Sequence, residues 1–180
     1  MYLRKPGSLV FILGILFCVT MKAYAGAQWQ AYNFEKFHFS IESPYPLTVT
    51  DHPFTPVPPG KYPMIRRMSA DSFQENRAFR VTADGNEYKK YKPSLEKVEK
   101  YLSAEAQKNE EAIQVIEVNC SGVPALLVKG DNGLIHTRTL VVVKSRFFWT
   151  IKVEYAENGP GTASAMADHV IQSLTIHGVD

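Results

Sequence analysis

The sequence is poor in cysteine, since Cys18 and Cys120 are the only two among 180 residues. Cys18 lies in an N-terminal segment that we expect to be removed, so Cys120 has no partner for a disulfide within the domain. The stability of the fold must then come from its hydrophobic core, and a domain of about 150 residues buries enough surface for that. We interpret Cys120 as a buried thiol at the end of a strand rather than as a redox or dimerising cysteine.

Sequence motifs that support catalysis are also missing. The chain has no G-x-S-x-G nucleophile elbow, no phosphate-binding P-loop and no G-x-G-x-x-G dinucleotide fingerprint. Ser94 to Lys97 spell S-x-x-K, but the K-T-G partner of that acyl-enzyme motif is absent, so we interpret Ser94 as a helix cap. The sequence therefore predicts that the protein is not an enzyme. The hypothesis of an unrecognised hydrolase requires a buried polar cluster with perturbed pKa values.

Metal-binding patterns are equally scarce. The five histidines are scattered, and none has another His, Cys or carboxylate at a standard ligand spacing. The remaining possibility is a contact between neighbouring strands that brings His136 to His38 or His177. We predict no metal and no cofactor.

The only long apolar run lies at the N-terminus. Arg4 and Lys5 precede the run from Leu9 to Val19, and Ala23-Tyr24-Ala25 follows it as an A-x-A cleavage site. The run is shorter than the roughly 20 residues that a membrane-spanning helix needs. Residues 1–25 are therefore predicted to be a secretory signal peptide that is cleaved between Ala25 and Gly26.

The mature chain, residues 26–180, is predicted to be a single exported domain without a transmembrane segment, either periplasmic or secreted. Cleavage removes three basic and no acidic residues, which leaves 17 basic and 18 acidic residues and a formal charge of −1. Nucleic-acid binding requires clustered Lys and Arg, so we exclude nucleic acid as a partner.

The N-terminal half of the mature chain has the pattern of strands around a proline-rich loop. Alternation of apolar and polar residues predicts strands over Phe37–Ile41, Ile65–Ala70 and Ala78–Ala83. Residues 51–63 contain five prolines, which favour an extended surface loop. Asp84-Gly85-Asn86 is typical of a turn after the third strand.

The C-terminal half has the pattern of a helix, four strands, a second helix and a short strand. Ser94 begins the first helix, where Leu95, Val98 and Leu102 share one face. Tight connections predict that the last three of the four strands form an antiparallel meander, with alternate residues of the final strand facing the core. The expected elements after the first helix are Ile113–Val118, Val123–Lys129, Leu134–Val143, Phe147–Tyr155, Thr162–Ser173 and Leu174–Ile176.

This order of elements resembles the PsbP-like proteins. The matching segments are Phe37–Ile41 with Pro44, Ser94-Leu95, Gly122-Val123-Pro124-Ala125, Phe147–Tyr155 and Ile171–Leu174. The resemblance implies an α+β fold, an α/β/α sandwich with a mostly antiparallel sheet of about six to seven strands and two main helices. The superfamily is named for a thylakoid-lumen extrinsic protein of photosystem II, and it includes a Ran-binding nuclear import factor and DcrB-type bacterial envelope proteins. These relatives mostly bind proteins, so the resemblance implies an adaptor.

The candidate binding residues lie on or beside the proline-rich loop. Phe54, Tyr62, Arg66 and Arg67 are aromatic or guanidinium side chains, which protein interfaces favour. The alternative is an ordinary long connection whose prolines reduce the entropy of the unfolded chain. A second basic and aromatic patch, Tyr88–Lys92, is interpreted as a solvated turn that leads into the helix.

Two hypotheses of function follow. The first is an exported, non-enzymatic accessory or assembly factor that binds another envelope or membrane protein. The second is a carrier of a small ligand or lipid, held between the core-facing side of Phe147–Tyr155 and the helices. A cavity of more than about 300 Å³ in that place would favour the carrier, whereas Phe147 and Trp149 argue for a filled core.

Overall fold

The computed structural model describes residues 28–52, 64–73, 78–89, 94–109, 112–156 and 162–179. The predicted signal peptide and residues 53–63 of the proline-rich loop lie outside these ranges, and so do Lys90, Tyr91 and Lys92 of the second patch. None of the helices in the described ranges combines the length and the apolar character that crossing a membrane requires.

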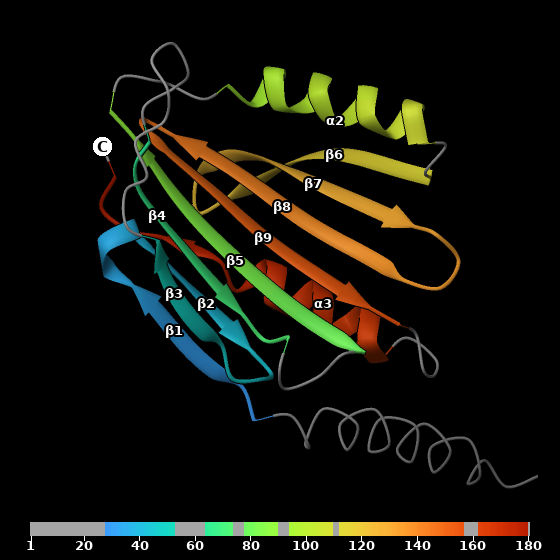
Figure 1. Ribbon diagram of the computed structural model, residues 1–180, viewed down its shortest axis with the longest axis horizontal. Coiled ribbons are helices and arrows are strands. Elements are labelled where there is room, and N and C mark those ends of the chain that lie inside the picture. Colours follow the sequence, from blue (N-terminus) through green and yellow to red (C-terminus); the bar gives the residue numbers. More distant parts are fainter. Residues whose placement is uncertain are drawn as a thin grey trace, which may run out of the picture.

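The main sheet has seven strands in the order β3-β4-β5-β9-β8-β7-β6, and every neighbouring pair is antiparallel (Figure 1). A smaller antiparallel sheet has the order β1-β2-β10. The strands are β1 (Gln30–Phe34), β2 (Phe39–Ser43), β3 (Thr48–His52), β4 (Met64–Asp71), β5 (Phe79–Tyr88), β6 (Ala112–Cys120), β7 (Val123–Asp131), β8 (His136–Lys144), β9 (Phe147–Tyr155) and β10 (Thr175–Ile176). The helices are the 3-10 turn η1 (Glu35–Phe37), α2 (Leu95–Asn109) and α3 (Thr162–Gln172).

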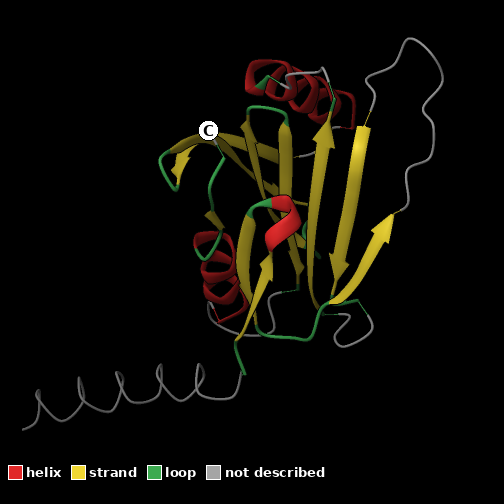
Figure 2. Cartoon of the chain, turned by 90° about the vertical axis from the view of Figure 1, so that its left-hand side faces the viewer, coloured by secondary structure: helices red, strands yellow, loops and turns green. Residues whose placement is uncertain are grey.

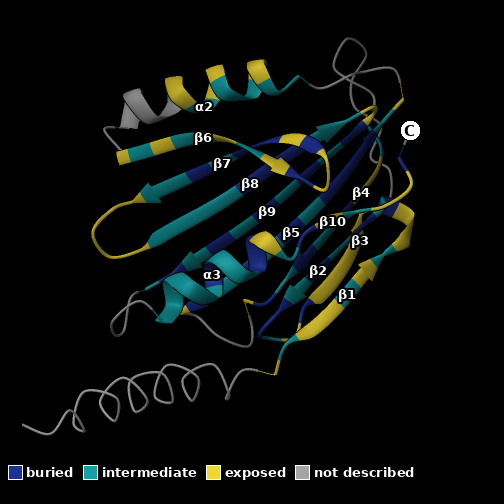
Figure 3. Cartoon of the chain, turned by 180° about the vertical axis from the view of Figure 1, so that it is seen from behind, coloured by how far each residue is buried: buried dark blue, intermediate teal, exposed yellow. Residues whose placement is uncertain are grey.

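The two faces of the main sheet are covered differently. The inner face, defined as the face that carries Trp149, packs against α3 and the small sheet (Figure 3). The outer face, which carries Thr150, packs against α2 over β6, β7 and β8. Figure 2 shows the main sheet nearly edge-on, with α3 on one side of it and α2 at the top of the view. The predicted α+β fold, with an antiparallel sheet and two main helices, is confirmed.

The core of the domain lies between the inner face and α3. Residues of β9 alternate between buried and half-buried along the whole strand, as the sequence pattern predicts. Ala167, Val170 and Ile171 supply the buried side of α3. The meander is also confirmed, and β6 extends it by one strand, so that β6 becomes one edge of the main sheet.

The turn predicted at Asp84-Gly85-Asn86 is wrong, because β5 continues through these residues to Tyr88. Gly85 faces the ring of Phe37, and a Cβ at this position would lie 2.9 Å from Phe37 Cδ1. The glycine therefore makes space for an aromatic ring and does not reverse the chain.

The first predicted strand is shifted. Phe37 belongs to η1, and His38 has a left-handed backbone conformation with φ of 58°, so β2 begins only at Phe39. The sequence interpretation missed β1 altogether. It also assigned residues 51 and 52 to the proline-rich loop, although β3 pairs with β4 through His52.

The strand predicted from Leu134 begins later, at His136. Asn132 Oδ1 accepts hydrogen bonds from the backbone N–H groups of Leu134 (3.1 Å) and Ile135 (2.8 Å). This bonding holds the two residues in a turn, where Leu134 is 82% exposed.

Candidate protein-binding surface

Two of the four predicted binding residues, Arg66 and Arg67, lie in the described part of the chain. Phe54 and Tyr62 lie outside the described residues, so their prediction stays untested. Arg66 and Arg67 are neighbours on β4, and successive side chains of a strand point to opposite faces. Arg66 lies opposite Glu87 on the inner side of the sheet, and Arg67 lies on the outer face.

Arg66 belongs to an ion-pair cluster within the fold. Its Nε donates to Glu87 Oε2 at 2.6 Å, and Arg146 Nη2 lies 2.8 Å from Glu87 Oε1. The Glu87 side chain is only 2% exposed, whereas both arginines are about half exposed. The guanidinium groups also stand over aromatic rings, Arg66 over Phe37 at 5.9 Å and Arg146 over Phe147 at 5.7 Å. We interpret Arg66 as a residue that holds the sheet together.

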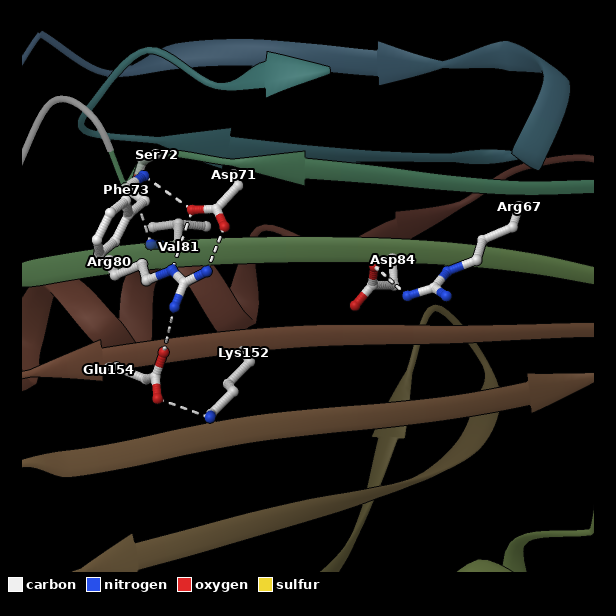
Figure 4. A network of polar contacts seen from close by, with 9 residues as sticks. All are labelled: Arg67, Asp71, Ser72, Phe73, Arg80, Val81, Asp84, Lys152 and Glu154. Atoms are coloured by element: carbon white, nitrogen blue, oxygen red, sulfur yellow. Dashed lines mark hydrogen bonds and ion pairs between the residues drawn. The ribbon is translucent and has the colours of Figure 1, made fainter. Parts of the chain in front are cut away.

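Arg67 faces solvent on the outer face of the sheet. Its side chain is 50% exposed, and its Nη2 lies 4.0 Å from Asp84 Oδ1, which is a weak surface ion pair (Figure 4). Of the two predicted arginines, Arg67 is therefore the one that can contact a partner without loss of a buried interaction.

A chain of charges runs across the same face from β4 to β9. Arg80 on β5 pairs with Asp71 on β4, where the Arg80 Nε to Asp71 Oδ1 distance is 3.1 Å. Arg80 Nη1 lies 3.5 Å from Glu154 Oε2, and Lys152 Nζ lies 2.7 Å from Glu154 Oε1 (Figure 4). Together with Arg67 and Asp84, the chain forms what we call the charged face. It comprises three basic and three acidic residues, Arg67, Asp71, Arg80, Asp84, Lys152 and Glu154.

No described helix lies over this surface. Figure 1 looks onto the outer face, and β4, β5 and β9 are seen there without a described helix in front of them, whereas α2 lies at β6 and β7. The sequence could have indicated the charged face, because its residues occupy alternate positions on β4, β5 and β9. It could not show which strands are neighbours.

Hydrogen bonding sets the acidity of Asp71. The Arg80 guanidinium lowers the pKa of the Asp71 carboxyl below its ordinary value of 3.8, against an opposing effect of burial. The backbone N–H of Phe73 donates to Asp71 Oδ1 at 2.8 Å and lowers the pKa further. Asp71 in turn raises the pKa of Arg80.

The lowered pKa of Asp71 predicts an acid-dependent contribution to stability. The ionised carboxylate stabilises the fold above its ordinary pKa, and this contribution is lost as the pH falls through the folded pKa. We expect Asp71→Asn to lower the free energy of unfolding by about 1 kcal/mol at pH 7 and by less at pH 2. Urea denaturation at both pH values measures this change in the free energy of unfolding. Asp51→Asn, in a 4.0 Å surface pair with Lys36, is the control. An equal loss from Asp71→Asn at both pH values would contradict the linkage.

The histidines have separate partners. His136 Nδ1 lies 3.3 Å from Asp131 Oδ2, and His177 Nε2 lies 2.9 Å from Ser40 Oγ. His38 stands edge-on to Phe147 at 5.1 Å. The part of the chain that the structure describes contains no group of three or more His, Cys, Asp or Glu residues that could hold a metal ion.

Cys120 is buried at the end of β6, as predicted, and burial raises the pKa of its thiol. On the inner face, Trp149, Ile151 and Val153 are fully buried, so side chains fill the place where the carrier hypothesis requires a cavity. One open groove of about 500 Å³ lies between α2 and the outer face at β6 and β7, and another of about 420 Å³ lies between α3 and the inner face at β6, β7 and β8, and no residue of β9 lines either groove.

Neither the protein-family models nor the curated proteins give a match to this sequence. Among solved structures, the chain is similar to the cyanobacterial PsbP protein of Synechocystis sp. PCC 6803, with a TM-score of 0.54 and 14% sequence identity over 84% of this chain and 94% of that one. Two structures from Pseudomonas aeruginosa each have a TM-score of 0.43. One is a protein of unknown function (10% identity, 84% of this chain, 99% of that one), and the other is the T6SS immunity protein TplEi complexed with an "L" peptide (11% identity, 92% and 84%). The PsbP-like fold expected from the sequence is confirmed.

Proposed function

We propose that the protein is an exported, non-enzymatic accessory or assembly factor that binds another envelope or membrane protein through its charged face. The observation that carries this proposal is the unequal covering of the outer face, where α2 packs on β6, β7 and β8 and the charged strands β4, β5 and β9 have no described helix over them. Export is inferred from the signal-peptide pattern of residues 1–25.

The charge pattern supports recognition of a protein. The charged face carries equal numbers of basic and acidic groups, so it offers no overall attraction to a polyanion such as nucleic acid. An alternating pattern selects a partner with the complementary order of charges, and a wrong partner meets like charges. Arg67 is the residue of this surface whose own ion pair is longest, at 4.0 Å, so it can change partners at the lowest cost. Phe54 and Tyr62 are proposed to extend the interface beyond β4.

Site-specific photo-crosslinking in cells that export the protein tests the proposal. A benzophenone amino acid in place of Ser69, which lies two residues from Arg67 on the same face, is expected to form an adduct with one envelope protein. The same group in place of Lys97, exposed on α2, is the control and should not form that adduct.

A charge reversal at Arg67 is the second part of the test. In the protein that carries the benzophenone amino acid in place of Ser69, Arg67→Glu should abolish the adduct. It should leave the melting temperature unchanged, because the ion pair of Arg67 with Asp84 is weak. The proposal is overturned if the adduct survives Arg67→Glu, or if Ser69 and Lys97 capture the same proteins.

A further inference from the structure

The edge strand β6 has features of a strand acceptor. Among the described residues it pairs with β7 alone, so alternate N–H and C=O groups along its other side point away from the sheet. Its sequence, AIQVIEVNC, contains neither the lysine nor the proline that commonly protects an edge strand. Its nine residues make it longer than β3, the opposite edge, which has five.

One groove of about 500 Å³ lies on the α2 side of this edge. Glu96 and Glu99 of α2 and Glu117 of β6 line it, and Pro124 and Leu126 of β7 complete one wall. No ion pair between described residues involves any of these three glutamates. The three glutamates thus have no ion-pair partner among the described residues, and a basic side chain complements the negative charge that they bring to the groove.

A second groove of about 420 Å³ lies on the α3 side of the same strand. Five of its eleven lining residues are aliphatic, namely Val118 of β6, Leu127, Leu140, Ile171 and Leu174, and the others include the polar residues Asn119, Asp168 and Gln172. Figure 3 shows this side of the sheet, where α3 leaves part of β6 and β7 uncovered. An aliphatic side chain fits these walls, because it removes their apolar surface from water.

We propose that β6 binds an extended segment of a partner protein as an eighth strand, with basic residues at every second position and apolar residues between them. In paired strands, residues directly opposite each other share a face. A residue opposite Glu117 thus points into the acidic groove on the α2 side, and the next residue, opposite Val118, points toward the aliphatic residues of the groove on the α3 side. Backbone hydrogen bonds supply affinity, and the two grooves supply specificity. This surface is separate from the charged face, so the inference does not depend on the proposed function.

Synthetic peptides test this strand addition directly. Fluorescently labelled Thr-Lys-Val-Lys-Val-Lys-Thr is titrated with the purified protein, and anisotropy measures its affinity. The peptide in which Glu replaces each Lys should bind at least about tenfold more weakly, because its charges repel the acidic groove. A version with alternate backbone amides N-methylated should also lose at least about tenfold, because it cannot donate to the edge of β6.

Variants of the protein separate this site from general charge attraction. Glu96→Gln, Glu99→Gln and Glu117→Gln together should weaken binding by about tenfold, whereas Asp51→Asn on the opposite edge strand should change it less than about twofold. Amide shifts in NMR spectra should concentrate on β6. Equal binding of the N-methylated or Glu peptide overturns the proposal, and so does a stable dimer joined at β6 that excess peptide does not dissociate.

Discussion

Replacement of Trp149 by alanine is expected to lower the free energy of unfolding by about 4 kcal/mol, within the range measured for large aromatic residues in protein cores. Trp149 is fully buried in the middle of the main sheet, and its ring stacks on Phe147 with centroids 5.5 Å apart. Its indole N–H donates to the carbonyl oxygen of Phe37 at 2.7 Å and so ties η1 to β9. Urea denaturation with an unchanged m-value measures the loss.

Trp149→Phe separates the two roles of this residue. Phenylalanine keeps most of the aromatic volume but removes the donor, which leaves the Phe37 carbonyl without its partner at a cost of about 1–3 kcal/mol. The free energy of unfolding of Trp149→Ala should therefore be clearly lower than that of Trp149→Phe. A loss below about 1 kcal/mol for Trp149→Ala would contradict the central place of this side chain in the core.

The sequence predicts the core strand well because one physical signal dominates there. In β9 the apolar residues Trp149, Ile151, Val153 and Tyr155 alternate with Thr150, Lys152 and Glu154, which is typical of a strand with one buried face. The capped, amphipathic pattern after Ser94 predicts α2 for the same reason. Local periodicity of this kind predicts the element correctly, because all the apolar residues of one face of the strand or helix are buried together.

The errors come from tertiary contacts that local patterns do not contain. Asp84-Gly85-Asn86 has the composition of a turn, but Gly85 serves the packing of Phe37, which lies 48 positions earlier in the sequence. No residue of the edge strand β3 is buried, so its sequence lacks the alternation of apolar and polar residues from which a strand is predicted. The role of β6 as an edge depends on strand order, which periodicity does not determine.

The candidate binding residues show the same difference between what local patterns and what tertiary contacts determine. The predicted strand Ile65–Ala70 already implies that Arg66 and Arg67 point to opposite faces. The partners of Arg66 could not be predicted, because Glu87 and Arg146 lie on other elements and meet it only through the pairing of β4, β5 and the β8–β9 turn. Of the two adjacent arginines that the sequence analysis grouped together, Arg66 pairs with a buried carboxylate and Arg67 faces solvent.

Charge reversal at Arg66 is expected to destabilise the fold by about 3 kcal/mol, because it removes one of the two cations beside a buried carboxylate and adds a like charge. Glu87 is 2% exposed, and Arg66→Glu would place a second carboxylate against it, with Arg146 as the remaining cation. The half-exposed position of Arg66 places the expected effect at the lower end of the range for buried pairs. Chemical denaturation measures the change.

Arg67→Glu is the matched control for this change, since it makes the same substitution one residue further along β4 on the outer face. Its expected cost is below about 1 kcal/mol, because its pair with Asp84 at 4.0 Å is solvated. The combined change of Arg66→Met and Glu87→Met should recover most of the stability, since it removes the buried charge together with its partner. If Arg66→Glu and Arg67→Glu unfold at the same denaturant concentration, Arg66 is a surface residue, and both arginines return to the candidate interface.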